Sequence, residues 1–144
     1  MSQIEAWLGN RILNADAIKK FVGLDVFPVW APQNALYPFV TFIRVGTERQ
    51  YCSGAAAQSD DLPRATFHIH CWDSDYFRLK DGLEDAVRQA LDGARVNSGT
   101  NLVASCFITD QYDIPEPITQ GREFPAFGTR FVVEITYLEP VLAN

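Results

Sequence analysis

One stretch of the sequence, Arg64 to Gly93, does most to restrict the fold, because it joins a strand pattern directly to a helix pattern. Aromatic, β-branched and imidazole side chains fill Ala65 to Trp72 without glycine or proline, which predicts a half-buried strand. Apolar residues then recur at helical spacing as far as Leu91, and Gly93 can end the helix in a left-handed conformation. Such a helix can cover the sheet that contains the strand, so the segment predicts one helical layer on one sheet.

The acidic residues of this segment fit structural roles. Asp73 and Asp75 can accept hydrogen bonds from the free N–H groups at the start of the helix. We expect three further carboxylates on the solvent side of the helix, and one of them, Glu84, can pair with Arg88 four residues later. These three are Asp81, Glu84 and Asp85. We therefore expect no catalytic carboxylate pair here.

Two helices are predicted before the first strand. The apolar residues Ile4, Trp7, Leu8 and Ile12 share one side of a helix from Gln3 to Leu13. Either Asn14 or Asp16 can cap a second helix that ends near Val22, and Gly23 closes it. The alternative is one kinked helix, because Gly9-Asn10 weakens the middle.

Four more strands and two long loops complete the predicted pattern. Pro28 confines a short strand from Asp25 to Trp30 to a sheet edge. The strand that begins at Pro38 is apolar on both faces over Phe39 to Ile43 and is therefore expected to be central. Further strands are predicted at Leu102–Asp113 and Gly128–Leu138, and long loops at Ser53–Leu62 and Ile114–Phe127.

This order predicts an α+β fold in one domain spanning residues 1–144: a mostly antiparallel β-sheet with one long helix and the N-terminal helices packed on one face. The composition, 47% hydrophobic and 12% aromatic, suits such a folded core. Apolar runs fall short of the roughly 18 residues that span a bilayer, so we expect no membrane segment. Glu5 lies where a secretory signal would be basic, so we expect no export.

The charge of the chain argues against one class of function, nucleic-acid binding. The formal net charge is −6, and scattered Lys and Arg form no stripe, which disfavours tight binding of nucleic acid.

The cysteines and histidines do not form a reactive site in the sequence. Cys71 and Cys106 lie in strand patterns and are expected to be buried, whereas Cys52 lies in a polar loop. His68 and His70 share a strand face, but the sequence lacks the further ligands that zinc needs at metal-site spacing. We expect no metal, no cofactor and no enzyme activity.

The long loops carry the candidate contact residues. A monomer gains little by exposing aromatic side chains, and such side chains are favoured in interfaces. The alternative is that these aromatics fold back as a lid over the sheet edge. The candidate interface residues are Tyr112, Ile114, Arg122, Phe124 and Phe127 around the second loop, and Asp60 and Asp61 in the first.

Three parts of the sequence, taken in order, resemble the tail terminator (tail-completion) proteins of tailed bacteriophages. They are a proline-led strand near residue 40, the stretch ATFHIHCWDSDYFRLKDGLEDAVRQAL and the stretch GTRFVVEITYLE. The Trp-Asp at the end of the strand, followed by the helix, is the most telling part, and the resemblance runs from the N-terminal helix to Tyr137. It implies a homohexameric ring on the last ring of the tail tube, which stops tube polymerisation and receives the neck proteins of the head.

The implied partners are copies of the same chain, the tail tube protein, a neck or head-completion protein and, in a contractile tail, the sheath protein. The ring would be part of the virion, assembled in the cytoplasm of a bacterial host, with DNA passing through a negative lumen without specific binding. Two alternatives stay open: another neck protein, such as a stopper ring, or a small cytoplasmic enzyme with a polar pocket around His68, His70 and Trp72.

Overall fold

The computed structural model describes residues 3–32, 34–48, 63–93, 103–118 and 126–137. Five strands form one sheet in the order β1-β2-β3-β5-β4. They are β1 (Val26–Pro28), β2 (Phe39–Glu48), β3 (Arg64–Asp73), β4 (Val103–Ile118) and β5 (Ala126–Tyr137). The β1–β2 pair is parallel and the other three pairs are antiparallel. The predicted α+β class with a mostly antiparallel sheet is therefore confirmed.

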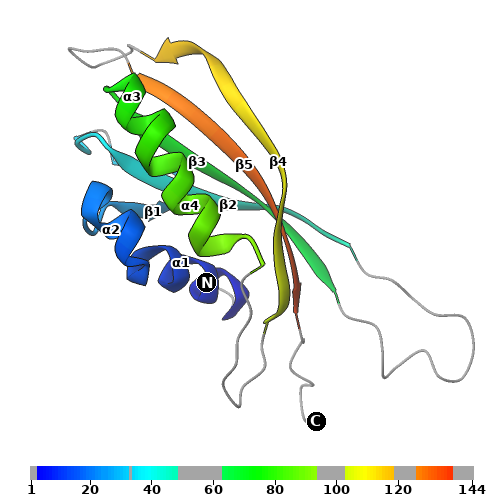
Figure 1. Cartoon of the computed structure of the whole chain (residues 1–144). Helices are drawn as coiled ribbons and strands as arrows, with labels where there is room; N and C mark the ends of the chain where they lie inside the picture. The colour runs from blue at the N-terminus through cyan, green and yellow to red at the C-terminus, as the bar shows by residue number, and fades with distance from the viewer. Residues whose placement is uncertain (1–2, 33, 49–62, 94–102, 119–125, 138–144) are drawn as a thin grey trace, which may run out of the picture.

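All the described helices lie on one face of the sheet (Figure 1). They are α1 (Gln3–Asn14), α2 (Asp16–Val22) and a longer helix made of α3 (Tyr76–Arg78), the π-helical segment η1 (Leu79–Leu83) and α4 (Glu84–Leu91). No helix within the described ranges is long and apolar enough to span a bilayer. Two separate N-terminal helices are confirmed, but Ala15 is the N-cap of α2 and makes no side-chain cap bond, so the expected cap at Asn14 or Asp16 is wrong.

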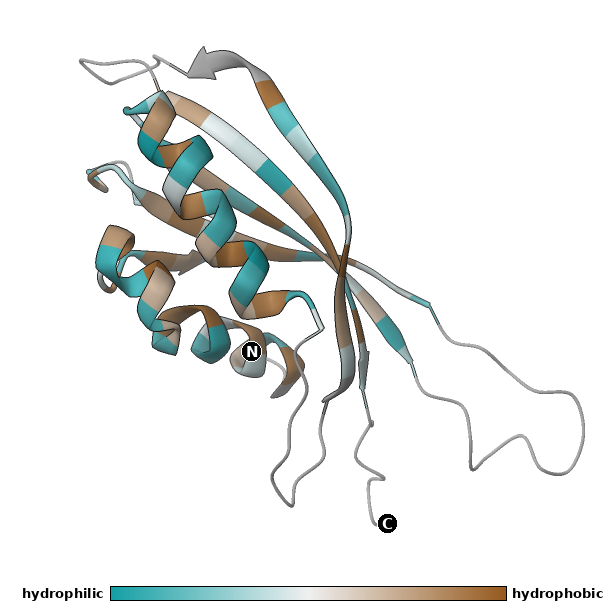
Figure 2. Cartoon of the chain, in the orientation of Figure 1, coloured by the Kyte–Doolittle hydropathy of each residue, from teal (hydrophilic) through white to brown (hydrophobic). Residues whose placement is uncertain are grey.

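The core lies between the helices and the sheet. Along β3, buried and half-buried residues alternate without exception, and β5 continues the alternation from Thr129 to Tyr137. Figure 2 shows hydrophobic and hydrophilic residues interspersed along the strands and helices. The fully buried side chains include Leu8 and Ile12 of α1, Leu83 and Leu91 of the long helix, and Phe67 and Phe131 of the sheet. Cys71 and Cys106 are buried as predicted.

The junction of β3 and the long helix is held by carboxylates. Asp75 is the N-cap, and its Oδ1 accepts from the N–H groups of Phe77 (3.1 Å) and Arg78 (3.2 Å). Asp73 is fully buried and receives two hydrogen bonds from the Arg78 guanidinium, at 2.7 Å and 2.6 Å. The capping role expected of Asp75 is confirmed, and Asp73 accepts from the backbone N–H of Asp75 (3.0 Å) in addition to its pairing with Arg78.

The solvent position expected for Glu84 is wrong. Its side chain is buried, accepts a hydrogen bond from Gln111 (2.6 Å) and lies 3.4 Å from Lys80. Arg88 pairs with Asp85 instead. The expectation overlooked that Glu84 lies at helical spacing from Val87 and Leu91, both buried, and so at the margin of the helix face that meets the sheet.

Two further expectations need correction. The segment Ile114–Phe127 is not a loop throughout: β4 runs to Ile118 and β5 begins at Ala126, while residues 119–125 lie outside the described residues. Prolines at 115 and 117 are tolerated because β4 is an edge strand and its register with β5 is irregular between Ile114 and Ile118. The loop predicted at Ser53–Leu62 and Cys52 also lie outside the described residues.

Candidate interaction surface

The sheet has an open face, which is the face turned away from the helices (Figure 1). It carries His68, His70 and Trp72 of β3 and Arg130, Val132 and Glu134 of β5, all half-buried. The strand registers arrange these side chains in rows across the sheet. One row is Phe39, Trp72, Gly128 and Ile114; the next is Thr41, His70, Arg130 and Tyr112.

His70 and Arg130 form the polar centre of this face. The Arg130 Nε–H donates to His70 Nε2 at 3.0 Å, so that nitrogen is unprotonated and the proton of the neutral imidazole lies on Nδ1. Burial, the positive charge of Arg130 and the neighbouring His68 lower the pKa of His70 to about 4. The pKa of His68 is also lowered, by burial and by Arg130. Both rings are therefore neutral at physiological pH.

The two histidines do not form a metal centre with other described residues. Their ring centroids are 6.2 Å apart. Within the described ranges, no group of three or more His, Cys, Asp or Glu side chains is placed to hold a metal ion. The hydrogen bond to Arg130 also occupies one of the nitrogens that would have to bind a metal.

Trp72 lies across Gly128 on the neighbouring strand. A Cβ atom at Gly128 would be 2.5 Å from Trp72 Cζ3 and 2.7 Å from Ile114 Cδ1. The indole and the end of the Ile114 side chain therefore meet above a backbone that has no side chain of its own. The glycine allows this close approach, which holds the indole against the sheet.

An aromatic cleft of about 300 Å³ opens on this face beside β1. Its lining residues come from three separate segments and are mostly aromatic or aliphatic. They are Val29, Trp30, Ala31, Tyr37, Phe39, Thr41, His70 and Trp72. Tyr37 stacks on Phe39 with ring centroids 5.4 Å apart, and Trp72 lies 6.2 Å from His70. With His70 neutral, none of the lining residues carries a charge, which suits an apolar contact rather than acid–base chemistry.

The structure places the predicted site residues on two different faces. Tyr112 lies on the open face beside Arg130, 51% exposed, and Ile114 lies in the next row. Phe127 lies on the helix-covered face, where its ring makes an edge-to-face contact with Tyr76 at 5.5 Å and packs against the core. Phe127 therefore lies in an interior strand rather than in a loop, and its role as a contact residue stays a prediction. Four other candidates, Arg122, Phe124, Asp60 and Asp61, lie outside the described residues.

The residues that sequence reasoning missed are Trp30, Tyr37 and Phe39. A signal was present, because residues 27–39 contain four aromatic side chains in thirteen residues, together with three prolines. Regular periodicity is lacking there, so the segment was interpreted as an edge strand and a turn. That interpretation gave the position of β1 at the sheet edge correctly but did not foresee the cleft.

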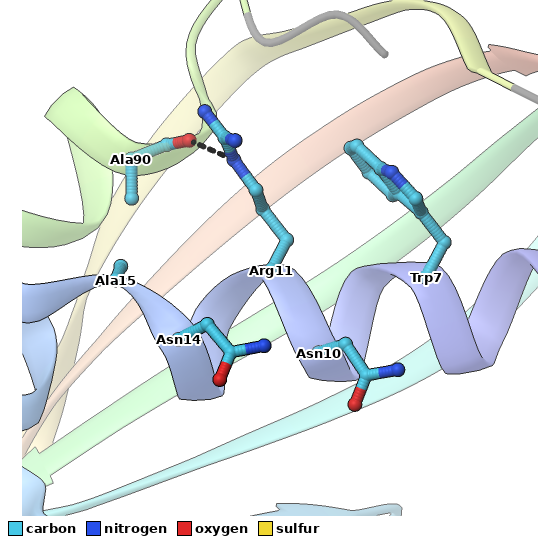
Figure 3. Close-up of a pocket in the computed structure, with 6 residues that line it drawn as sticks. All are labelled: Trp7, Asn10, Arg11, Asn14, Ala15 and Ala90. Atoms are coloured by element: carbon cyan, nitrogen blue, oxygen red, sulfur yellow. Dashed lines mark hydrogen bonds between the residues drawn. The ribbon is translucent and has the colours of Figure 1, made fainter. Parts of the chain in front are cut away.

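A second cleft, of about 380 Å³, lies between α1 and the end of α4. Figure 3 shows Trp7 and Arg11 rising from the same side of α1, with Arg11 Nε donating to the Ala90 carbonyl at 3.0 Å. The other lining residues are Asn10, Asn14 and Ala15. The hydrogen bond fixes the N-terminal helix to the long helix, so this cleft marks the junction between two structural elements.

No family model matches the sequence, and no curated protein matches it. The fold is similar to that of a chain in a solved structure described as the virion of a native gene transfer agent (GTA) particle. The TM-score is 0.62 at 14% sequence identity, and the match covers 89% of each chain. At this identity the likeness concerns the fold.

Proposed function

We propose that this protein is a structural component of a phage-like virion. In this proposal it forms a homohexameric ring at the head-proximal end of the tail tube, ends tube polymerisation and joins the tail to the neck. The observation that carries the proposal is the fold likeness to a chain of a gene transfer agent virion over nearly the whole length of both chains. The resemblance of the strand, helix and return strand to tail terminator proteins supports the finer assignment.

The division of the molecule into two faces suits a ring subunit. The helices cover one face and bury a continuous apolar core, which gives a rigid body. The open face and the edges of the sheet carry exposed aromatic side chains, which can contact other subunits. In the proposed ring, α1 and the long helix form the outer wall.

The partners follow from this position in the particle. They are neighbouring copies of the chain, the tail tube protein, a neck protein and, where the tail is contractile, the sheath protein. The net charge of −6 per subunit lets DNA pass through the lumen without the phosphate contacts that basic residues would make.

Electron microscopy of particles produced without this gene tests the proposal. We expect headless tails longer than those of the wild type, with normal length restored when the gene is supplied in trans. Tails of normal length that fail to join heads would instead indicate a stopper or other neck protein. Intact, correctly joined particles in the absence of the gene would refute a structural role at this junction.

A further inference from the structure

The outer side of β1 offers a neighbouring molecule no free backbone donor among its described residues. Val26 N–H donates to the Leu24 carbonyl at 2.9 Å, and Pro28 has no N–H. Trp30 N–H, which follows, donates to the Pro28 carbonyl at 2.8 Å. Because backbone donors are required to extend a sheet, another strand cannot be added here by the usual ladder. A contact at this edge must be made by side chains.

A strained turn presents those side chains. Val29 has a φ of 69°, in the left-handed region that β-branched residues avoid. The Trp30 N–H donates to the Pro28 carbonyl across Val29, so these three residues form a γ-turn with a positive φ at its centre, which is the rarer of the two γ-turn types. The turn leaves Trp30 79% exposed at the rim of the aromatic cleft. A strained backbone that holds an indole in solvent contributes nothing to the core, and such strain is typical of contact sites.

The chemistry of the cleft selects its occupant. The lining carries no charged side chain, so phosphate-bearing ligands find no cation there. Sugars find no carboxylate or carboxamide there. What fits is an uncharged aromatic or aliphatic surface of a protein. The edge patch, defined as Val29, Trp30 and the aromatic cleft, is therefore suited to aromatic side chains.

The opposite edge of the same sheet carries such a surface. β1 and β4 are the two edge strands, and on β4 Phe107 and Tyr112 are 47% and 51% exposed. Both lie on the open face, opposite Glu134 and Arg130 of β5. Residues 105–114 include two aspartates and no Lys or Arg, so β4 itself brings no cation to the contact, and the neighbouring Arg130 is already hydrogen-bonded to His70.

Strand directions allow the two edges to meet. β1 is parallel to β2, and the three antiparallel pairs that follow make β4 antiparallel to β1. A copy placed alongside by rotation therefore brings its β4 next to β1 in the opposite direction. Contacts between two different surfaces of identical subunits form closed rings when the rotation closes.

We propose that the edge patch is the docking surface for Phe107 and Tyr112 of a second copy of this chain, in a head-to-tail contact made by side chains. The proposal rests on the ring of the proposed function and deepens it by naming the two surfaces. It does not depend on the position of the ring in the particle.

Sedimentation equilibrium of the full-length protein over a range of concentrations tests this contact. We expect wild-type self-association to weaken roughly 30-fold in Trp30→Ala, the loss typical of an interface hot spot. The double variant Phe107→Ala/Tyr112→Ala should weaken by at least as much. Phe77→Ala is the matched control: Phe77 is 72% exposed at the start of the long helix, belongs to neither surface and should leave association unchanged.

Mixing the two defective variants tests the direction of the contact. Trp30→Ala retains an intact β4 surface, and Phe107→Ala/Tyr112→Ala retains an intact edge patch. In a head-to-tail contact their mixture forms a dimer with near wild-type affinity that cannot grow. No recovery on mixing, a strictly monomeric wild type, or a Trp30→Ala variant that associates normally would each overturn the inference. Failure of this contact can be told from failure of the proposed function. Self-association in solution tests the contact, whereas tail length in particles that carry Trp30→Ala tests the function, and the two measurements are independent.

Discussion

Replacing Gly128 by Ala tests whether the Trp72 indole is held flat on the open face. The new Cβ would be 2.5 Å from Trp72 Cζ3 and 2.7 Å from Trp72 Cε3, closer than non-bonded carbon atoms approach. The backbone cannot retreat, because β5 is paired with β3 on one side and β4 on the other. The rigid indole must therefore leave its position and take one wall of the aromatic cleft with it.

The magnitude follows from two opposing effects. Overpacking of this kind costs about 1 to 3 kcal/mol. Alanine in place of glycine within a strand recovers about 0.5 to 1 kcal/mol, because the unfolded chain loses freedom. Together these effects leave a net cost of about 0 to 2.5 kcal/mol. Because the indole is rigid and the backbone is paired on both sides, we expect Gly128→Ala to lower the free energy of unfolding by about 1 to 2 kcal/mol, measured by equilibrium unfolding in urea.

Gly46→Ala is the matched control. Gly46 also lies in a strand, but a Cβ there meets nothing within 4 Å, so alanine should be neutral or slightly stabilising. In a Trp72→Leu background the cost of Gly128→Ala should fall by about 1 kcal/mol, because the clashing ring atoms are gone. An unchanged cost in that background, or a Gly128→Ala variant as stable as wild type, would refute the reasoning.

Three further predictions concern the two faces of the sheet. Because the folded-state pKa of His70 is about 4, below the unfolded value of about 6.5, stability should fall as the pH drops between these values. The variant His70→Gln keeps an acceptor for Arg130 but does not titrate. It should therefore remove about 1 to 2 kcal/mol of this pH-dependent loss of unfolding free energy, measured by urea titration; the figure is reduced because solvent partly screens the half-exposed ring. Cys71 and Cys106 should resist iodoacetamide at pH 8 and react only on unfolding, because burial raises both pKa values, that of Cys106 to about 12; peptide mapping would detect exceptions. Val133→Asp should abolish cooperative melting, since it buries an uncompensated charge at a cost of at least several kcal/mol; a soluble variant that melts cooperatively would contradict the burial of Val133.

Local sequence patterns were sufficient where a segment obeys one regular period. The alternation from Ala65 to Trp72 and the helical spacing as far as Leu91 gave β3 and the helix over it. Gly93 has a φ of 75° and follows the last helical turn, as the sequence predicted. Burial of one face is enough to specify such elements.

Irregular elements were not predictable in the same way. The π-helical turn at Leu79–Leu83 has no periodic signal, and the burial of Glu84 depends on a partner distant in the sequence, Gln111. The extension of β4 past Pro115 was missed for a related reason, since prolines resemble loop residues until the strand is known to be an edge.

The order of strands depends on contacts between segments distant in the sequence. From the sequence alone, either Phe39–Val45 or Gly128–Leu138 could be a free edge that extends the sheet across subunits. β5 instead lies between β3 and β4, so the second of these is an interior strand. In Phe39–Val45, which belongs to β2, residues Val40 to Phe42 are paired with β1. Only the later part of β2 is therefore not covered by β1. The pattern of side chains in a single strand carries no information about which neighbour it meets.

The position of the open-face residues is a consequence of core packing. Because side chains alternate in a strand, a slip of β3 by one residue would exchange His70 with Cys71 and place the imidazole in the core. Burial of Phe67 and Ile69 on the helix-covered face therefore fixes His70 beside Thr41 and Trp72 beside Phe39 on the other. The walls of the aromatic cleft are therefore positioned by the core, while its exposed member Trp30 can change without loss of the fold. This separation fits the proposed contact, in which the core stays rigid and one edge of the sheet meets a second copy of the chain.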